Sequence, residues 1–237
     1  LERADDGSWR VRGLPGDGEG VDPFDALEPL GELQVIGGRL TLDAPSLGIQ
    51  ATLARIDLRL QVDADRVRSA ARAWIDEDAT PVQLALDLDR RADRGRAHAA
   101  IADADLGAWA PLLRHAGIQV EGGQGRAQVW LQLQQGRVRQ ATVDAALADV
   151  ALRGAPLAAG GDAPGLRIGG LEARARWQAR GDGWRLDAPR LRLAREGAAA
   201  QVLDGLAVAG GPRFALRAER IDAGPLLTAL ALTDRLG

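Results

Sequence analysis

The chain has 237 residues, of which 46% are hydrophobic and 27% charged, so it can bury an apolar core. Its net charge of -3, and the lack of an arginine stripe interleaved with aromatic residues, argue against a nucleic-acid-binding protein. No run reaches the ~18 apolar residues of a membrane-spanning helix, and no cysteine is present to form a disulfide.

The composition is also biased. Lys, Asn, Tyr, Met and Cys are missing, so all 30 basic residues are arginine. Most of the missing types have AT-rich codons, and we therefore attribute the bias to a high-GC genome rather than to phosphate recognition. Because the chain does not begin with Met, we expect it to be a section of a longer protein.

Alternation of apolar and polar residues predicts strands along most of the chain. In the first half we expect strands at residues 7–14, 37–45, 49–65, 66–76, 81–89 and 95–106, with short helices at 22–30 and 107–117. The alanines of segment 66–76 would permit a helix, but its alternation and its neighbours favour a strand. In the second half we expect a hairpin at 125–147 that turns at Gln135-Gly136, and a second hairpin at 169–197 that turns at Gly181-Asp182-Gly183. We also expect strands at 150–154, 198–208 and 213–222, and a helix at 224–237.

These elements predict a mostly β fold: a long curved antiparallel sheet, groove-like and partly open, with two or three short helices. The hairpin-like turns favour antiparallel pairing, and alternating strand–helix units, which would indicate a Rossmann-type sheet, are not found. We treat residues 1–237 as a single β-rich section. Two sub-sections, 1–120 and 121–237, are the alternative.

Residues that could carry chemistry are few. His98 and His115 have no third ligand at a metal-binding spacing, and none of the three serines lies in a GxSxG motif. The glycine-rich stretch "EGGQG" at 121–125 precedes a strand, whereas a phosphate-binding loop would open a helix. We therefore predict no catalytic site, no metal site and no cofactor.

Six tryptophans are spread along the chain, mostly within predicted strands, which favours packing in a core or at its rim. A carbohydrate-binding surface is the alternative, and it would require three or more tryptophans on one exposed surface. The six residues are Trp9, Trp74, Trp109, Trp130, Trp177 and Trp184.

The apolar sides of the predicted strands carry Leu, Val, Ala and Ile, and the whole chain has two Phe. Because a closed sandwich usually fills its centre with more large aromatic side chains, this pattern favours a trough for acyl chains. At ~25 cal/mol per Å² of apolar area covered, an acyl chain along several strands would gain several kcal/mol. The candidate lipid-contacting residues are Leu58, Leu60, Val82, Leu84, Leu86, Leu88, Val129, Leu131 and Leu133.

Several stretches resemble the AsmA-like superfamily of Gram-negative envelope proteins, and most closely its YhdP branch. They include "DGSWRVRGL", "GELQVIGGRLTL", "GDGWRLDAPRLRL" and the spaced Gly, Trp, Asp and Leu residues between Gly123 and Leu152. The resemblance implies a long protein anchored in the inner membrane, whose large periplasmic part moves phospholipid between the inner and outer membranes.

By that resemblance, this chain is expected to be a periplasmic section that binds or conducts phospholipid acyl chains in an apolar β-groove. Its contacts with membranes would be made by parts of the parent protein outside this chain, and no protein partner is identified. The alternative is a non-catalytic scaffolding module with a closed β core that binds a protein partner. In that case the predicted helices at 107–116 and 224–235 would cover the sheet.

Overall fold

A computed structural model describes most of the chain, and all structural statements below concern the described residues. These are residues 2–3, 9–10, 24, 27–44, 49–115, 118–154, 163–195 and 201–219. The chain forms two compact units, which we describe separately. The first unit comprises residues 1–100 and 131–137, and the second comprises 101–130 and 138–237.

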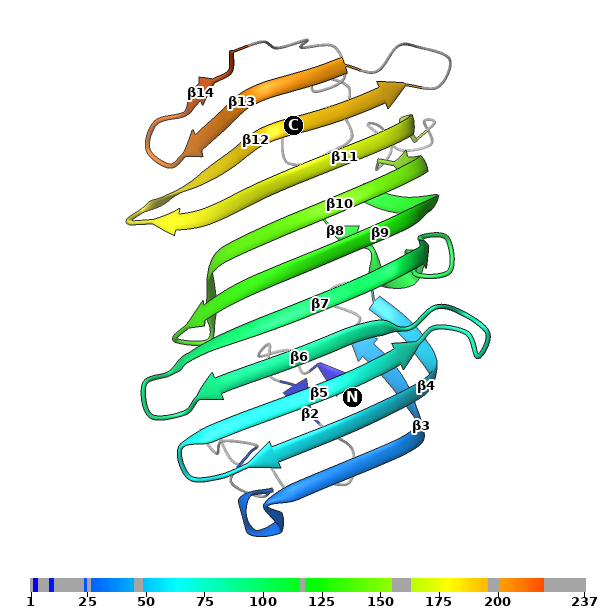
Figure 1. Ribbon diagram of the computed structural model, residues 1–237, viewed down its shortest axis with the longest axis vertical. Helices are drawn as coiled ribbons and strands as arrows, with labels where there is room; N and C mark the ends of the chain where they lie inside the picture. The colour runs from blue at the N-terminus through cyan, green and yellow to red at the C-terminus, as the bar shows by residue number, and fades with distance from the viewer. Residues whose placement is uncertain are drawn as a thin grey trace. The chain divides into compact units, whose positions relative to one another are not determined.

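The first unit is an open sheet in which strands adjacent in sequence pair in space (Figure 1). From β3 to β7 every pairing is antiparallel, and the short β1 adds one parallel bridge between Glu2 and Asp43. The strands, in their spatial order, are β2 (Trp9–Arg10), β1 (Glu2–Arg3), β3 (Glu32–Ala44), β4 (Ile49–Val62), β5 (Arg66–Trp74), β6 (Val82–Asp89) and β7 (Arg94–Asp105).

Two local features fix the register of this sheet. At the β4–β5 turn, the Asp63 carboxylate accepts the backbone N–H groups of Asp65 and Arg66 at 2.9 and 2.7 Å. In β3 a bulge interrupts the pairing with β4, where Gly37 has a φ of 66° and donates its N–H to Asp57 Oδ1 at 2.8 Å. Glycine suits this bulge because a left-handed φ strains other residues.

The second unit is also an open antiparallel sheet with sequential strands. The β9–β10 turn lies at Gln135-Gly136, where φ is 52° and 63°, which confirms the predicted hairpin and is typical of a type I′ turn. The strands are β8 (Arg114–His115), which pairs with β9 (Ile118–Gln134), followed by β10 (Arg137–Arg153), β11 (Gly165–Arg180), β12 (Gly183–Arg195), β13 (Gln201–Gly210) and β14 (Ala215–Arg217).

Each unit buries a small apolar cluster. In the first unit the cluster contains Leu60, Val62 and Val67, and in the second it contains Val150, Leu166 and Ile168. Among the described residues no charged or polar side chain is buried, and Val67 alone is a large side chain with essentially no exposure. Among the residues that the structure describes, much of each sheet is therefore not covered by a second layer comparable with a sandwich core.

The predicted short helices are wrong within the described residues. The segments predicted at 22–30 and 107–117 contain 3-10 turns instead, η1 (Glu28–Leu30) and η3 (Ala110–Leu112). A proline sits in the first turn of each, and the chain enters a strand soon after, so neither segment is long enough for an α-helix. The helix predicted at 224–237 lies outside the described residues.

Two predicted boundaries also change. The strand predicted to start at Gly37 begins at Glu32, because the glycine pair forms a bulge inside the strand rather than its entry. The glycine-rich stretch 121–125, expected to precede a strand, lies inside β9. The ambiguous segment 66–76 is a strand over Arg66–Trp74, as predicted.

Candidate functional site

Six of the nine candidate residues lie on one face of the first unit. Across the strands, Leu58 is opposite Ala71 and Ala71 is opposite Leu84. Because side chains alternate along a strand, the other candidates on β4 and β6 share that face. We call it the apolar face of the first unit, and its members include Val35, Leu58, Leu60, Ala71, Val82, Leu84, Leu86 and Leu88.

One end of the apolar face is covered. Leu60 is 8% exposed and forms a buried cluster with Val62 and Val67. Leu88 packs against this cluster. The cover consists of Phe24 and Leu27, which precede η1 and pack on the same cluster.

Two interactions hold this cover in place. Arg90, whose side chain is 11% exposed, donates to Glu28 Oε2 at 2.7 Å and to Asp63 O at 3.0 Å, and so joins η1 to the end of the sheet. The Val62 N–H donates to Gly31 O at 2.9 Å. Leu60 and Leu88 therefore belong to a small closed core.

The middle of the apolar face is more open. Leu84 is 42% exposed, and Leu58, Val82 and Leu86 are half-buried. Large and small side chains alternate across the strands here, since Leu84 lies between Ala71 and Ala99. The apolar face is thus closed at one end and accessible in its middle.

The other three candidates lie on β9. Val129, Leu131 and Leu133 alternate with Trp130, Gln132 and Gln134 and are half-buried. Leu131 and Leu133 belong to the first unit and Val129 to the second. Within the first unit, β9 is joined to the start of β7 by the Gln135 N–H, which donates to Asp93 O at 2.8 Å.

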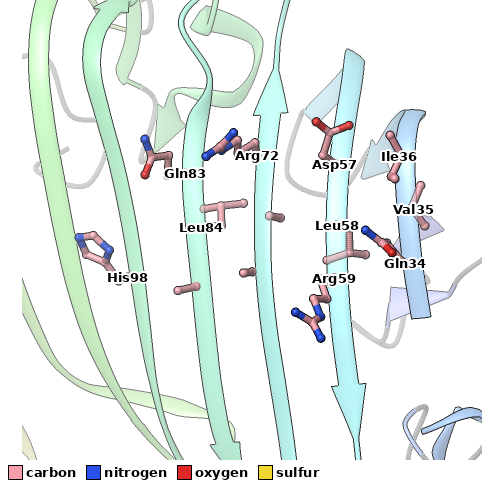
Figure 2. Close-up of a pocket in the computed structure, with 13 residues that line it drawn as sticks. Gln34, Val35, Ile36, Asp57, Leu58, Arg59, Arg72, Gln83, Leu84 and His98 are labelled. Carbon is pink, nitrogen blue, oxygen red and sulfur yellow. The ribbon is translucent and has the colours of Figure 1, made fainter. Parts of the chain in front are cut away.

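The opposite face of the first unit is polar and carries a depression of about 430 Å³ (Figure 2). Figure 2 shows Arg72 and Gln83 projecting to one side of their strands and Leu84 to the other. Ala70 and Ala85, which are opposite each other, leave the low floor of this depression. Sequence reasoning missed it, because an alanine at an outward-facing strand position carries no signal until the register is known.

Several charges on this polar face are paired. The hydrogen bond from Arg59 to Glu32, at 2.9 Å, is the main cause of a lowered Glu32 pKa, and Gln61 adds to it. The pKa of Asp57 is likewise lowered by Arg55 and by the backbone N–H of Gly37. These carboxylates are ionised structural partners of arginine, and the arrangement offers no general acid–base pair.

The remaining candidate chemistry does not assemble into a site. His98 lies on β7 at the edge of the depression, and His115 ends β8. Within the described ranges no three His, Asp or Glu side chains are placed to hold a metal ion. Among the tryptophan side chains that the structure describes, Trp130 is exposed, at 39%, and the others are half-buried. The described residues therefore do not form the surface of three exposed tryptophans that a carbohydrate-binding site would require.

The second unit has an apolar face of its own, which the candidate list omitted. Trp177 is opposite Leu186, and that row continues through Val208 to Leu216. The exposed fraction reaches 53% at Leu216 on the three-residue β14. The alternation of residues 184–188 is the sequence signal that could have found this face.

Comparisons with known proteins bear on the whole chain. A family model described as "YhdP protein" matches residues 11–236. No curated protein and no solved structure matches the chain. In the part of the chain that the structure describes, no helix has the length and apolar character to cross a membrane.

Proposed function

The chain belongs to the YhdP family, and we propose that it is a section of a periplasmic lipid-transport protein that holds phospholipid acyl chains on its apolar β surface. The single observation that carries the proposal is the accessible middle of the apolar face, where Leu84 is 42% exposed among half-buried aliphatic side chains. In this proposal the parent protein is anchored in the inner membrane by parts outside this chain.

The chemistry of the face supports weak, unspecific binding. Covering the exposed part of Leu84 would contribute about 1 kcal/mol, and each neighbouring Leu or Val somewhat less. The named residues of the apolar face are all uncharged, so none of them selects one lipid headgroup. A surface of this kind holds a chain by area alone and releases it again, which suits transfer rather than storage. No catalytic step is part of the proposal.

A closed scaffolding module is the second candidate, and one observation favours it. Phe24 and Leu27 already cover Leu60, Val62 and Val67, as a permanent core would require. In that case the exposed part of Leu84 would be ordinary protein surface and would bind no lipid. The two candidates differ in whether the chain carries lipid when it is purified without detergent.

The test compares two substitutions at adjacent positions of β6. Leu84→Asp places a carboxylate on the apolar face, and Gln83→Asp places one on the polar face of the same strand. Each chain is expressed in a bacterial periplasm, purified without detergent, and examined by native mass spectrometry and solvent extraction. Because an acyl chain over a carboxylate would remove it from water, we expect Leu84→Asp to lower bound phospholipid by about tenfold or more. Gln83→Asp should keep the wild-type amount.

Circular dichroism provides the control, since both variants must keep the β spectrum of the wild type. Equal lipid in a folded Leu84→Asp variant and in the wild type would contradict the proposed surface. A wild-type chain that carries no lipid at all would favour the closed scaffolding module.

A further inference from the structure

The polar face of the second unit carries a depression rich in arginine. Its volume is about 560 Å³, and its lining residues come mainly from β11 to β14, with Thr142 from β10. The charged residues that line it are Arg174, Arg176, Arg185, Asp187, Arg217 and Glu219.

The strand register explains why these side chains meet. Arg176 is opposite Asp187, Asp187 is opposite Ala207, and Ala207 is opposite Arg217, so all four lie in one row on one face. The small Ala207 separates the two charged strands and leaves room in front of Arg217. Arg174, one pair further along β11, directly faces Arg190, and like charges at facing positions destabilise a sheet.

The carboxylate of this row is already paired with a neighbouring arginine. Asp187 is held by Arg185, which donates to both of its oxygens at 2.6–2.9 Å, and this hydrogen bonding is the main cause of its lowered pKa. Arg174 reaches Asp144 at 3.7 Å, a long ion pair. Within the described residues, neither Arg176 nor Arg217 has a carboxylate within ion-pair distance, although the charge of Arg176 adds to the lowering of the Asp187 pKa.

The first unit provides the contrast. On its polar face each of three arginines has a close carboxylate: Arg55 with Asp57 at 2.7 Å, Arg59 with Glu32 at 2.9 Å, and Arg66 with Asp87 at 2.9 Å. The same kind of sheet can therefore pair its surface charges. In the depression of the second unit, Arg176 and Arg217 have no carboxylate at such a short distance.

We propose that this depression binds the phosphate group of an anionic ligand, with Arg176 and Arg217 as its direct contacts and Arg174 beside them. A guanidinium presents several N–H donors in a plane and can bind two phosphate oxygens at once. Glu219 also lines the depression, close to Gly205, and its negative charge opposes the anion. The site lies on the polar face of the second unit, so it is independent of the acyl-chain surface proposed above.

The phosphate could belong to a soluble phosphomonoester or to the headgroup of an anionic lipid, and two probes separate these sources. Glycerol 3-phosphate is titrated into the whole chain by isothermal titration calorimetry at low salt. Vesicles of phosphatidylcholine with phosphatidylglycerol, and vesicles of phosphatidylcholine alone, are compared by co-flotation. Binding of glycerol 3-phosphate identifies a site for free phosphate, and binding to the anionic vesicles alone identifies a site for lipid headgroups.

The double variant Arg176→Gln/Arg217→Gln tests the residues. Both side chains are exposed, so the fold should not depend on them. Whichever probe the wild type binds, we expect the double variant to bind it about tenfold or more weakly, because two charge-assisted contacts are lost. The matched control is Arg139→Gln/Arg213→Gln, which removes the same charge at exposed positions outside the depression and should change affinity less than about threefold.

Glu219→Gln supplies a result in the opposite direction, since removal of the opposing charge should tighten binding. The proposal is overturned if neither probe binds the wild-type chain. It is also overturned if the two double variants weaken binding equally, because attraction would then follow net charge rather than this depression.

Discussion

Alanine substitutions at Val67 and Leu84 compare how much the closed end and the open middle of the apolar face contribute to stability. The Val67 side chain is 0% exposed and packs with Leu60 and Val62 under the cover of Phe24 and Leu27. Val67→Ala removes two methyl groups, which costs about 1.6 kcal/mol in lost burial. An unfilled cavity of about 40–50 Å³ adds roughly 1 kcal/mol. We expect the first unit to lose about 2–3 kcal/mol.

Leu84→Ala removes one carbon more but should cost less. Because 42% of Leu84 is exposed, the loss of burial is at most about 1.4 kcal/mol. Solvent reaches the vacated space, so little cavity penalty is added. The expected order is the reverse of the usual one, in which Leu→Ala costs more than Val→Ala.

Hydrogen exchange followed by mass spectrometry provides the assay. Peptides that cover β4, β5 and β6 report the stability of the first unit separately from the second. If Leu84→Ala proves as costly as Val67→Ala, or costlier, the middle of the apolar face is covered in solution and the reasoning from exposure fails.

Two further predictions concern the sheets themselves. Gly125 has a φ of 141°, and a Cβ there would overlap Ala146 O. Gly125→Ala should therefore lower the unfolding free energy of the second unit by about 2–3 kcal/mol in urea titrations. An unchanged urea midpoint would contradict the close approach of β9 to β10. Asp57, whose pKa is lowered by Arg55 and Gly37, stabilises the fold above its unfolded pKa of about 3.9, and this contribution is lost as pH falls through the lower folded value. Asp57→Asn should therefore lower the urea midpoint at pH 7 and have little effect near pH 2, whereas an equal loss at both pH values would exclude an ionic origin.

Much of the fold could be predicted because its determinants are local. Apolar–polar alternation identified β6 within one residue of its observed start, and the turn at Gln135-Gly136 follows from two adjacent residues. The β3 bulge could not be predicted, because Gly37 is stabilised by Asp57, twenty residues away. The helix expected at 107–117 was wrong because its alanines and leucines suit a helix locally, while Pro111 and the return to strand β8 limit it to a 3-10 turn.

For the candidate site, too, the features set by local sequence could be predicted and those set by distant contacts could not. Alternation was enough to place the candidates of β4 and β6 on one face. It could not show that Leu60 and Leu88 are covered while Leu84 is not, since that depends on packing by Phe24 and Leu27 from a distant segment. The arginine-lined depression was also missed, because Arg176 and Arg217 are 41 residues apart in sequence and meet only through the register of three strand pairs.

The sequential order of the strands has a consequence for how such a protein can fold and change in length. From β3 to β7, and again from β9 to β14, consecutive strands pair with each other. Stability is then close to a sum of nearest-neighbour terms, as in repeat proteins, and structure can begin at any hairpin and spread to the next. A gene could gain or lose one hairpin without disturbing distant pairings. The length of the surface could therefore evolve in steps of two strands, at a modest cost in folding rate.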